Sequence, residues 1–146
     1  MKTLLTVILL TLSLNTLADK KYIIGGFSKH MGYPVPLNEV HPGVGVETNN
    51  IELAVYQNSL DRESFAVAYV DRPWYIKGVK VGYRLGVASG YPDDTQREGY
   101  DGRMYNLRGT YNGFMPQAQL VFSKGFGPVY VDLGVAPVTT LTFKVR

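Results

Sequence analysis

The sequence predicts an all-β protein, an antiparallel up-and-down β-barrel of about eight strands. From residue 22 onward, apolar and polar residues alternate with a period of two, which is the period of a β-strand. The alternating segments have similar lengths and are separated by turn signals. The chain contains 16 Gly and 11 Tyr, and only 18% of its residues are charged. Soluble domains have about 25% charged residues, so this balance favours a membrane barrel.

The clearest strand lies at residues 79–90. Successive side chains of a strand point to opposite faces, so this segment has one apolar face and one face of small or charged residues. The same alternation recurs at 51–58, 128–136 and 139–145. We predict strands near residues 22–30, 42–48, 51–58, 64–71, 79–90, 116–123, 128–136 and 139–145.

Short turns and long loops separate these strands. Asn49-Asn50, the segment 124–128 and the segment 137–139 are short turn signals, which we place together at one end of the barrel. The segments 31–41, 58–63 and 91–115 are longer, and we place them at the other end as loops. Within the last of these loops, residues 104–111 are alternatively a short strand. Long loops on one rim and short turns on the other are typical of outer-membrane barrels.

Whether the apolar face of each strand points into the barrel or away from it distinguishes a soluble barrel from a membrane barrel. A soluble, calycin-like barrel would place the valines inside and the charges outside. A membrane barrel places the valines toward lipid and the charges in an internal network. Glycine weakens a strand unless a large group packs against it, as in a filled lumen. Gly82, Gly86 and Gly134 therefore favour the membrane barrel, with an internal network of Glu47, Glu52, Lys80, Arg84 and Asp132.

The N-terminal residues have the pattern of a signal peptide. Met1-Lys2 precedes an apolar run at 3–14, and Thr16-Leu17-Ala18 ends in the small residue that a signal peptidase prefers. The alternative, an uncleaved anchor, is disfavoured because the apolar run is shorter than the ~20 residues of a membrane helix. We predict a signal peptide at 1–18 and one barrel domain at 19–146. The protein is then exported, to the outer membrane or, alternatively, to the periplasm or medium as a soluble barrel.

The amino-acid composition also limits which ligands and partners we expect for the protein. The sequence has no cysteine, which removes disulfides and thiolate metal sites. The net charge of +3 is small and the basic residues are scattered, so we expect no nucleic acid partner. Contact with anionic lipid headgroups stays open. No metal-ligand spacing or phosphate-binding loop is present, and we predict no metal, no cofactor and a monomer.

His30 and Ser59 are the residues best suited to chemistry. His30 ends one predicted strand and Ser59 follows another, both at the rim with the long loops, where functional residues commonly lie. A serine hydroxyl is a weak nucleophile unless a base lies within hydrogen-bonding reach, and histidine titrates near neutral pH. The pair is therefore a candidate for acyl transfer, with His30 as general base, Ser59 as nucleophile or polarising hydroxyl, and Asn58 orienting the site. Asp61, Glu63 and Asp71 are nearby acids. The structural alternative is a solvated loop histidine and an ordinary Asn-Ser turn. We expect His41, Asn38 and Glu39 to be structural.

Several short motifs together resemble the outer-membrane lipid A palmitoyltransferases. They are His30 at the end of the first strand, Asn38-Glu39 before the Gly-rich strand 43–47, Asn58-Ser59 closing the next hairpin strand, Pro116, Gly-Phe-Gly-Pro-Val at 125–129 and Ala136-Pro137. These motifs extend over most of the chain after the predicted signal peptide. The resemblance implies an outer-membrane acyltransferase that moves a fatty acyl chain from phospholipid to lipid A.

The resemblance also implies roles for particular residues. His30 and Ser59 match residues implicated in activity, and Asn58 stands where the family has Asp. If Asn58 is a degraded catalytic position, Asn58→Asp is expected to raise activity. Pro116 and Pro137 match prolines that leave strands unpaired and open a lateral route to the lumen, and Gly82 and Gly86 are assigned to deepening the acyl slot. The alternatives are an esterase on the same barrel, acting on phospholipid or lipid A, and a non-catalytic calycin-like lipid-binding barrel.

Overall fold

The structure, a computed structural model, describes residues 20–92, 95–106 and 112–146. The signal peptide predicted at 1–18 lies outside the described residues. Among the residues described, no helix is long and apolar enough to cross a membrane. The strands are β1 (Lys21–His30), β2 (Val40–His41), β3 (Gly43–Thr48), β4 (Ile51–Gln57), β5 (Glu63–Ile76), β6 (Val79–Ala88), β7 (Gln96–Glu98), β8 (Met104–Asn106), β9 (Met115–Phe126), β10 (Val129–Val135) and β11 (Val138–Val145).

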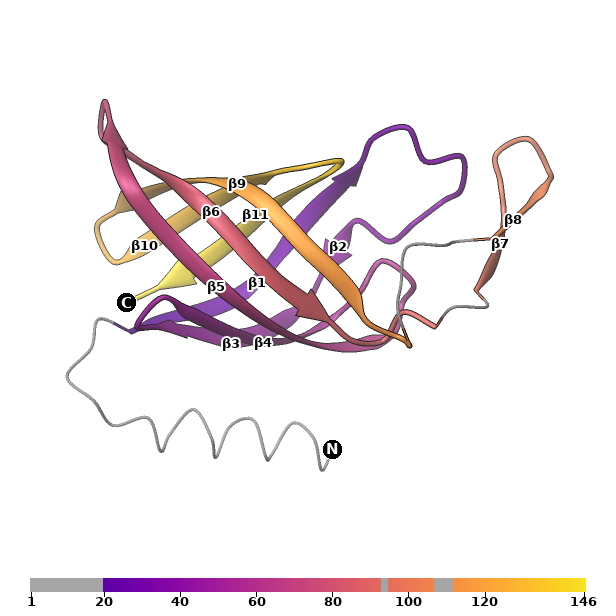
Figure 1. Ribbon diagram of the computed structural model, residues 1–146, viewed down its shortest axis with the longest axis horizontal. Helices are drawn as coiled ribbons and strands as arrows, with labels where there is room; N and C mark the ends of the chain where they lie inside the picture. The colour runs from indigo at the N-terminus through magenta and orange to yellow at the C-terminus, as the bar shows by residue number, and fades with distance from the viewer. Residues whose placement is uncertain (1–19, 93–94, 107–111) are drawn as a thin grey trace.

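The long strands close into an antiparallel eight-stranded barrel (Figure 1). Neighbouring strands pair in the order β11-β10-β9-β6-β5-β4-β3-β1, and β11 pairs in turn with β1 to close the wall. The two-residue β2 and the longer β3 both pair with the same edge of β1, one after the other along that strand. It pairs with β1 at Gly26 and Phe27, whereas β3 pairs with β1 at residues 21–23. The predicted fold class is therefore confirmed, and the pairing of β11 with β1 closes the sheet on itself.

The turns distinguish the two ends of the barrel. The turns β3–β4, β5–β6 and β9–β10 lie at one end, where β1 begins and β11 finishes. Asn49 and Asn50 both have positive φ, as do Lys77 and Gly78, which is the geometry of a tight type I′ hairpin. The segment after Pro137 was expected at this end, and this was wrong. Val138 pairs with His30, so the β10–β11 turn lies at the opposite end, which we call the rim.

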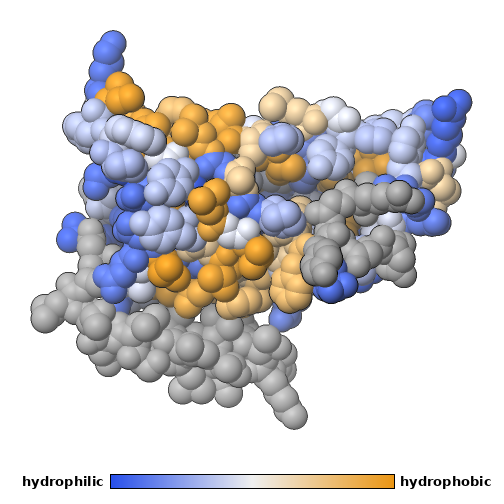
Figure 2. Space-filling view, in the orientation of Figure 1, coloured by the Kyte–Doolittle hydropathy of each residue, from blue (hydrophilic) through white to orange (hydrophobic). Residues whose placement is uncertain are grey.

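The wall presents its apolar face outward, as predicted. On β6, Leu85 and Val87 are 51% and 46% exposed, whereas Arg84, which directly precedes Leu85, is only 4% exposed. On β10, Leu133 and Val135 are exposed while Asp132 is buried. Figure 2 shows hydrophobic residues along the barrel wall and hydrophilic residues around the β7–β8 hairpin. The arrangement is inverted relative to a soluble barrel, whose charged residues face water.

The loop between β6 and β9 carries a short hairpin outside the barrel. In it β7 pairs with β8 through Gln96–Asn106, Arg97–Tyr105 and Glu98–Met104. The alternative of a short strand at 104–111 that extends the barrel sheet is therefore met only in part: a strand is present at Met104–Asn106, but it belongs to a separate two-stranded sheet. Residues 107–111 lie outside the described part of the chain. Arg97 anchors the hairpin to the rim, because its guanidinium donates to the Leu60 carbonyl at 3.0 Å.

Candidate active site

The structure brings His30 and Ser59 together at the rim. β1 ends at His30, and Ser59 lies in the loop that leaves β4 at the same end of the barrel. His30 Nε2 and Ser59 Oγ are 2.9 Å apart, within hydrogen-bonding distance. Ser59 is buried and His30 is partly exposed. The two groups thus have the separation that a general base and its hydroxyl require.

Asn58 shapes the turn that presents Ser59. Its side chain is fully buried and donates through Nδ2 to the Gly90 carbonyl at 2.9 Å. Its Oδ1 accepts from the backbone N–H groups of Leu60, at 2.9 Å, and Arg62, at 3.1 Å. These contacts all go to the backbone, so Asn58 orients Ser59 through the turn and has no hydrogen bond to His30.

Asn38 ties the loop after β1 to the same turn. Its backbone N–H donates to the Ser59 carbonyl at 3.0 Å. Its side chain donates to the Val40 carbonyl at 2.7 Å and accepts from the Val40 N–H at 3.0 Å. Glu39 beside it forms an exposed ion pair with Lys29 at 2.9 Å. The expected structural role of this pair is thus borne out, and its effect is to fix the loop against Ser59.

A second histidine, His41, is linked to His30 through Ser28. Ser28 Oγ is 2.7 Å from His41 Nε2 and 3.5 Å from His30 Nδ1. His41 Nδ1 is in turn 2.8 Å from the Gln57 carbonyl oxygen. Sequence reasoning treated His41 as structural and did not single out Ser28. The available signal was the period of two along β1, which places Ser28 and His30 on one face.

Burial keeps the His30 imidazole in its neutral form. Burial lowers the pKa of His30 below the ordinary histidine value, and the nearby His41 and Lys29 lower it further, while Glu39 opposes them. Tyr33 packs edge-on against the ring, with centroids 5.6 Å apart. At neutral pH the imidazole is therefore a free base, which is the form able to accept a proton.

Tyr91 provides a hydroxyl at the same place. It is buried with Leu60, Ala66 and Ala88 in an apolar cluster under the rim. Burial and the neighbouring Tyr56 raise the pKa of Tyr91, whereas hydrogen bonding with Ser59 acts in the opposite direction. Tyr91 therefore stays protonated at neutral pH and retains an O–H donor near Ser59.

The nearby acids do not assemble with the pair. The Asp61 carboxylate is exposed and lies 3.8 Å from Arg97, and Glu63 is exposed at the start of β5. Asp71 accepts from Asn50 at 3.3 Å, beside the turns at the far end. In the described part of the chain, no carboxylate hydrogen-bonds to the His30 ring. Ser28 faces Nδ1 of that ring, the position that a carboxylate takes in a catalytic triad.

The pair lies at the mouth of a cavity in the barrel lumen. The cavity has a volume of about 380 Å³, which is within the ~300–1,000 Å³ range of ligand pockets. Pro116 and Pro137 line it, as do His30, Ser59 and Tyr91. Gly82 and Gly86, which were assigned to the slot, are not among its lining residues. Three other glycines are: Gly25, Gly26 and Gly43.

Close backbone contacts explain where the two misassigned glycines lie. A Cβ on Gly82 would overlap the Asp71 carbonyl oxygen, and one on Gly86 would overlap the Val67 carbonyl oxygen. Both glycines therefore permit close approach of β5 to β6. At Gly82 this approach coincides with a bulge in β5 between Asp71 and Trp74.

A buried charged network closes the lumen below the cavity. We call it the floor cluster, and it consists of Glu47, Glu52, Arg72, Arg84, Asp132 and Lys144. The Arg84 guanidinium is 3.1 Å from Glu52, and Arg72 forms a two-pronged pair with Glu47, with both N···O distances 2.8 Å. The predicted internal network is present, with Arg72 and Lys144 as additional members. Lys80 was also expected in it, but this was wrong, because Lys80 is exposed near the β5–β6 turn.

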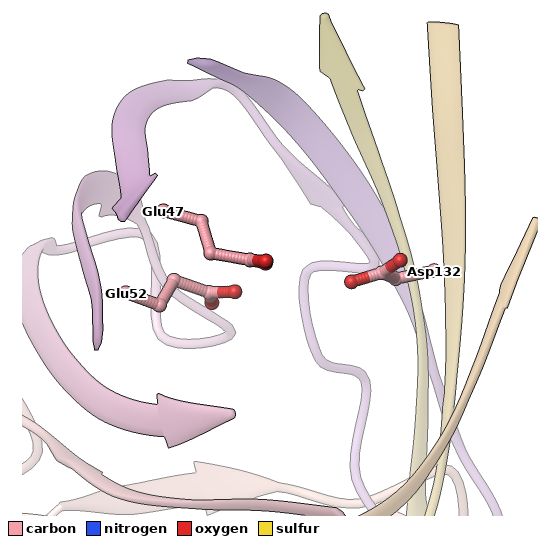
Figure 3. A group of neighbouring side chains, drawn as sticks. All are labelled: Glu47, Glu52 and Asp132. Carbon is pink, nitrogen blue, oxygen red and sulfur yellow. The ribbon is translucent and has the colours of Figure 1, made fainter. Parts of the chain in front are cut away.

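The carboxylates of the floor cluster converge like metal ligands. Figure 3 shows Glu47, Glu52 and Asp132 pointing toward one another, and their oxygens lie within 4.8 Å. Lys144 is fully buried, and its ammonium contacts all three, at 2.8 Å for Glu52 and 2.7 Å for Asp132. A lysine ammonium thus supplies the positive charge that a metal ion would bring. Glu52 and Arg84 also line the cavity, so this network forms its inner end.

No protein-family model matches this sequence, and a search of curated proteins finds no match. The resemblance to the lipid A palmitoyltransferases therefore stays a prediction. The geometry of the rim and lumen is what supports a function.

Proposed function

We propose that the protein is an outer-membrane acyltransferase that moves a fatty acyl chain from a phospholipid to a lipid A-type acceptor. The observation that carries the proposal is the 2.9 Å contact between Ser59 Oγ and His30 Nε2 at the mouth of a lumen cavity. Ester chemistry needs a base beside a hydroxyl, and a long acyl chain needs a site shielded from water. The rim provides the base and the hydroxyl, and the lumen provides a cavity beside them for the chain.

The chemistry proceeds in two balanced steps. In the first, Ser59 Oγ bonds to the acyl carbonyl carbon while His30 Nε2 takes the hydroxyl proton. The donor ester C–O bond breaks, and the departing oxygen takes that proton from His30, releasing lysophospholipid. In the second, an acceptor hydroxyl gives its proton to His30 and bonds to the carbonyl carbon, and Ser59 leaves and regains the proton. The neutral His30 described above is the form that both steps begin from.

Strand pairing offers an entry route for the acyl chain. β9 pairs with β6 from Met115 onward, but its pairing with β10 begins only at Leu120. Residues 115–119 therefore have no registered partner in β10, and Pro116, which lacks an N–H donor, lies within this stretch. The same stretch lines the cavity, as does Pro137 across the gap. This combination supports lateral access from the surrounding lipid.

The outer wall supports placement in a membrane. Large apolar side chains are exposed on successive strands, whereas the charged floor cluster is buried inside. Soluble monomers rarely expose extended apolar surfaces, because these aggregate in water. A bilayer would cover this wall and deliver phospholipid to the opening beside β9.

Lipid mass spectrometry tests the proposal. Cells expressing the intact protein or His30→Ala are compared with cells carrying no copy. An extra acyl chain on lipid A that depends on His30 supports transfer. Free fatty acid with lysophospholipid shows hydrolysis instead, in which water replaces the acceptor. Unchanged lipids in all three cultures would refute an enzymatic function and leave a lipid-binding barrel.

A further inference from the structure

A directed chain of hydrogen bonds leads from the backbone of β4 to Ser59 through both histidines of the sequence. It runs from the Gln57 carbonyl to His41, then Ser28, then His30, then Ser59. Its links are 2.8, 2.7, 3.5 and 2.9 Å long. Each link fixes the proton position in the next, because donors and acceptors must alternate.

The chain begins at a group that is only able to accept. The Gln57 carbonyl oxygen has no proton, so His41 Nδ1 must carry the hydrogen that joins them. In a neutral imidazole the other nitrogen is then an acceptor. His41 Nε2 therefore accepts the Ser28 hydroxyl proton across 2.7 Å.

Ser28 transmits this direction to His30. With its proton committed to His41, Ser28 Oγ presents only lone pairs to His30 Nδ1, so the hydrogen of the neutral His30 ring belongs on Nδ1. Nε2 then carries the free lone pair and faces the Ser59 hydroxyl at 2.9 Å. Ser59 alone would not select this tautomer, because a hydroxyl is able to donate or accept.

We infer that Ser28 and His41 are positioning residues that hold His30 in the tautomer able to deprotonate Ser59. The inference rests on the proposed function for its importance to catalysis, but the tautomer itself is a property of the folded protein alone. Ser28 and His41 thus take the part that a carboxylate plays in a catalytic triad, where the third residue fixes the tautomer and orientation of the base. Neither residue touches the substrate in this role.

Nitrogen NMR measures the tautomer without any activity. The sequence has only two histidines, so a ¹⁵N-histidine sample of the full-length protein in detergent micelles contains two rings to assign. Above the pH at which both rings are neutral, we expect His30 to be protonated at Nδ1. Ser28→Ala and His41→Phe should each convert this single form into a mixture. Ser28→Thr, which keeps the hydroxyl, should preserve it, and Ser89→Ala, which contacts the Phe65 N–H and neither histidine, serves as the matched control.

The rate of ester cleavage gives a second readout. Loss of one tautomer-fixing hydrogen bond should slow Ser28→Ala by about 2- to 10-fold and leave Ser28→Thr near wild type. A wild-type His30 protonated at Nε2, or a tautomer unchanged by Ser28→Ala, would overturn the inference even if the protein were active. If the protein shows the predicted tautomers but transfers no acyl chain, the proposed function is refuted and this inference still holds. A variant that fails to fold is recognised because it loses the dispersed resonances of the wild-type protein. The tautomer of wild-type His30 and the remaining variant, His41→Phe, then decide the outcome.

Discussion

Asn58→Asp distinguishes a turn residue from a degraded catalytic acid. Asn58 is fully buried, and its Nδ2 donates to the Gly90 carbonyl at 2.9 Å. The substitution removes this donor and sets a carboxylate oxygen against the carbonyl oxygen. A buried acceptor left unsatisfied costs about 1–3 kcal/mol, while the other carboxylate oxygen keeps the N–H donors of Leu60 and Arg62. We therefore expect a loss of about 1–3 kcal/mol in unfolding free energy and a fall in activity.

Urea titration of the barrel in detergent micelles measures this loss. Trp74 is the only tryptophan in the sequence, so its fluorescence reports unfolding from a single position on β5. The control is Asn106→Asp, the same change at an exposed position at the end of β8, which should stay within about 0.5 kcal/mol of wild type. Full stability of Asn58→Asp together with raised activity would refute the reasoning and show that position 58 acts on His30 directly.

Three further outcomes follow from the floor cluster, the base and the cavity. Lys144→Met leaves the carboxylates of Glu47, Glu52 and Asp132 without the ammonium that they share and should destabilise the barrel by about 3–5 kcal/mol in the same titration, whereas the exposed Lys80→Met should not. Burial lowers the pKa of His30, so the rate should stay constant as the pH falls to below the ordinary histidine pKa and should drop only when His30 becomes protonated. A rate that already drops above the ordinary histidine pKa would contradict this. Ala66→Leu, inside the cavity, should slow cleavage of long-chain esters more than short ones, while the outward-facing Val67→Leu should affect neither; equal effects on all chain lengths would place the acyl chain elsewhere.

Local alternation was enough to predict the wall and to place His30 and Ser59 at the same rim, whereas the resemblance to the palmitoyltransferases is what favoured them as a catalytic pair. Along β6 the period of two separates the exposed Leu85 and Val87 from the buried Arg84. Once the strands alternate in direction, the ends of β1 and β4 must share a rim, which brings His30 to Ser59. These features depend only on neighbours in sequence and on strand direction.

The features that sequence reasoning missed depend on register and on partners far apart in sequence. Arg72 continues the inward side of β5 that includes Ala68 and Val70, but it lies one residue beyond the strand predicted at 64–71. Its ion-pair partners, Glu47 and Asp132, come from β3 and β10. Lys80, paired with Tyr75 beyond the bulge, stays exposed near the turn. The contact between Ser28 and His41 likewise depends on how β2 pairs with β1, which no local pattern reveals.

Covalent labelling of Ser59 tests the central claim most directly. A fluorophosphonate ester forms a stable bond with a serine oxygen only where a base activates it, and intact-protein mass spectrometry followed by peptide mapping locates the adduct. We predict one adduct, on Ser59, that is absent from Ser59→Ala and forms about 10²–10⁴-fold more slowly in His30→Ala. An unlabelled wild-type protein, or equal labelling of wild type and His30→Ala, would contradict the account, because Ser59 would then not be a nucleophile activated by His30.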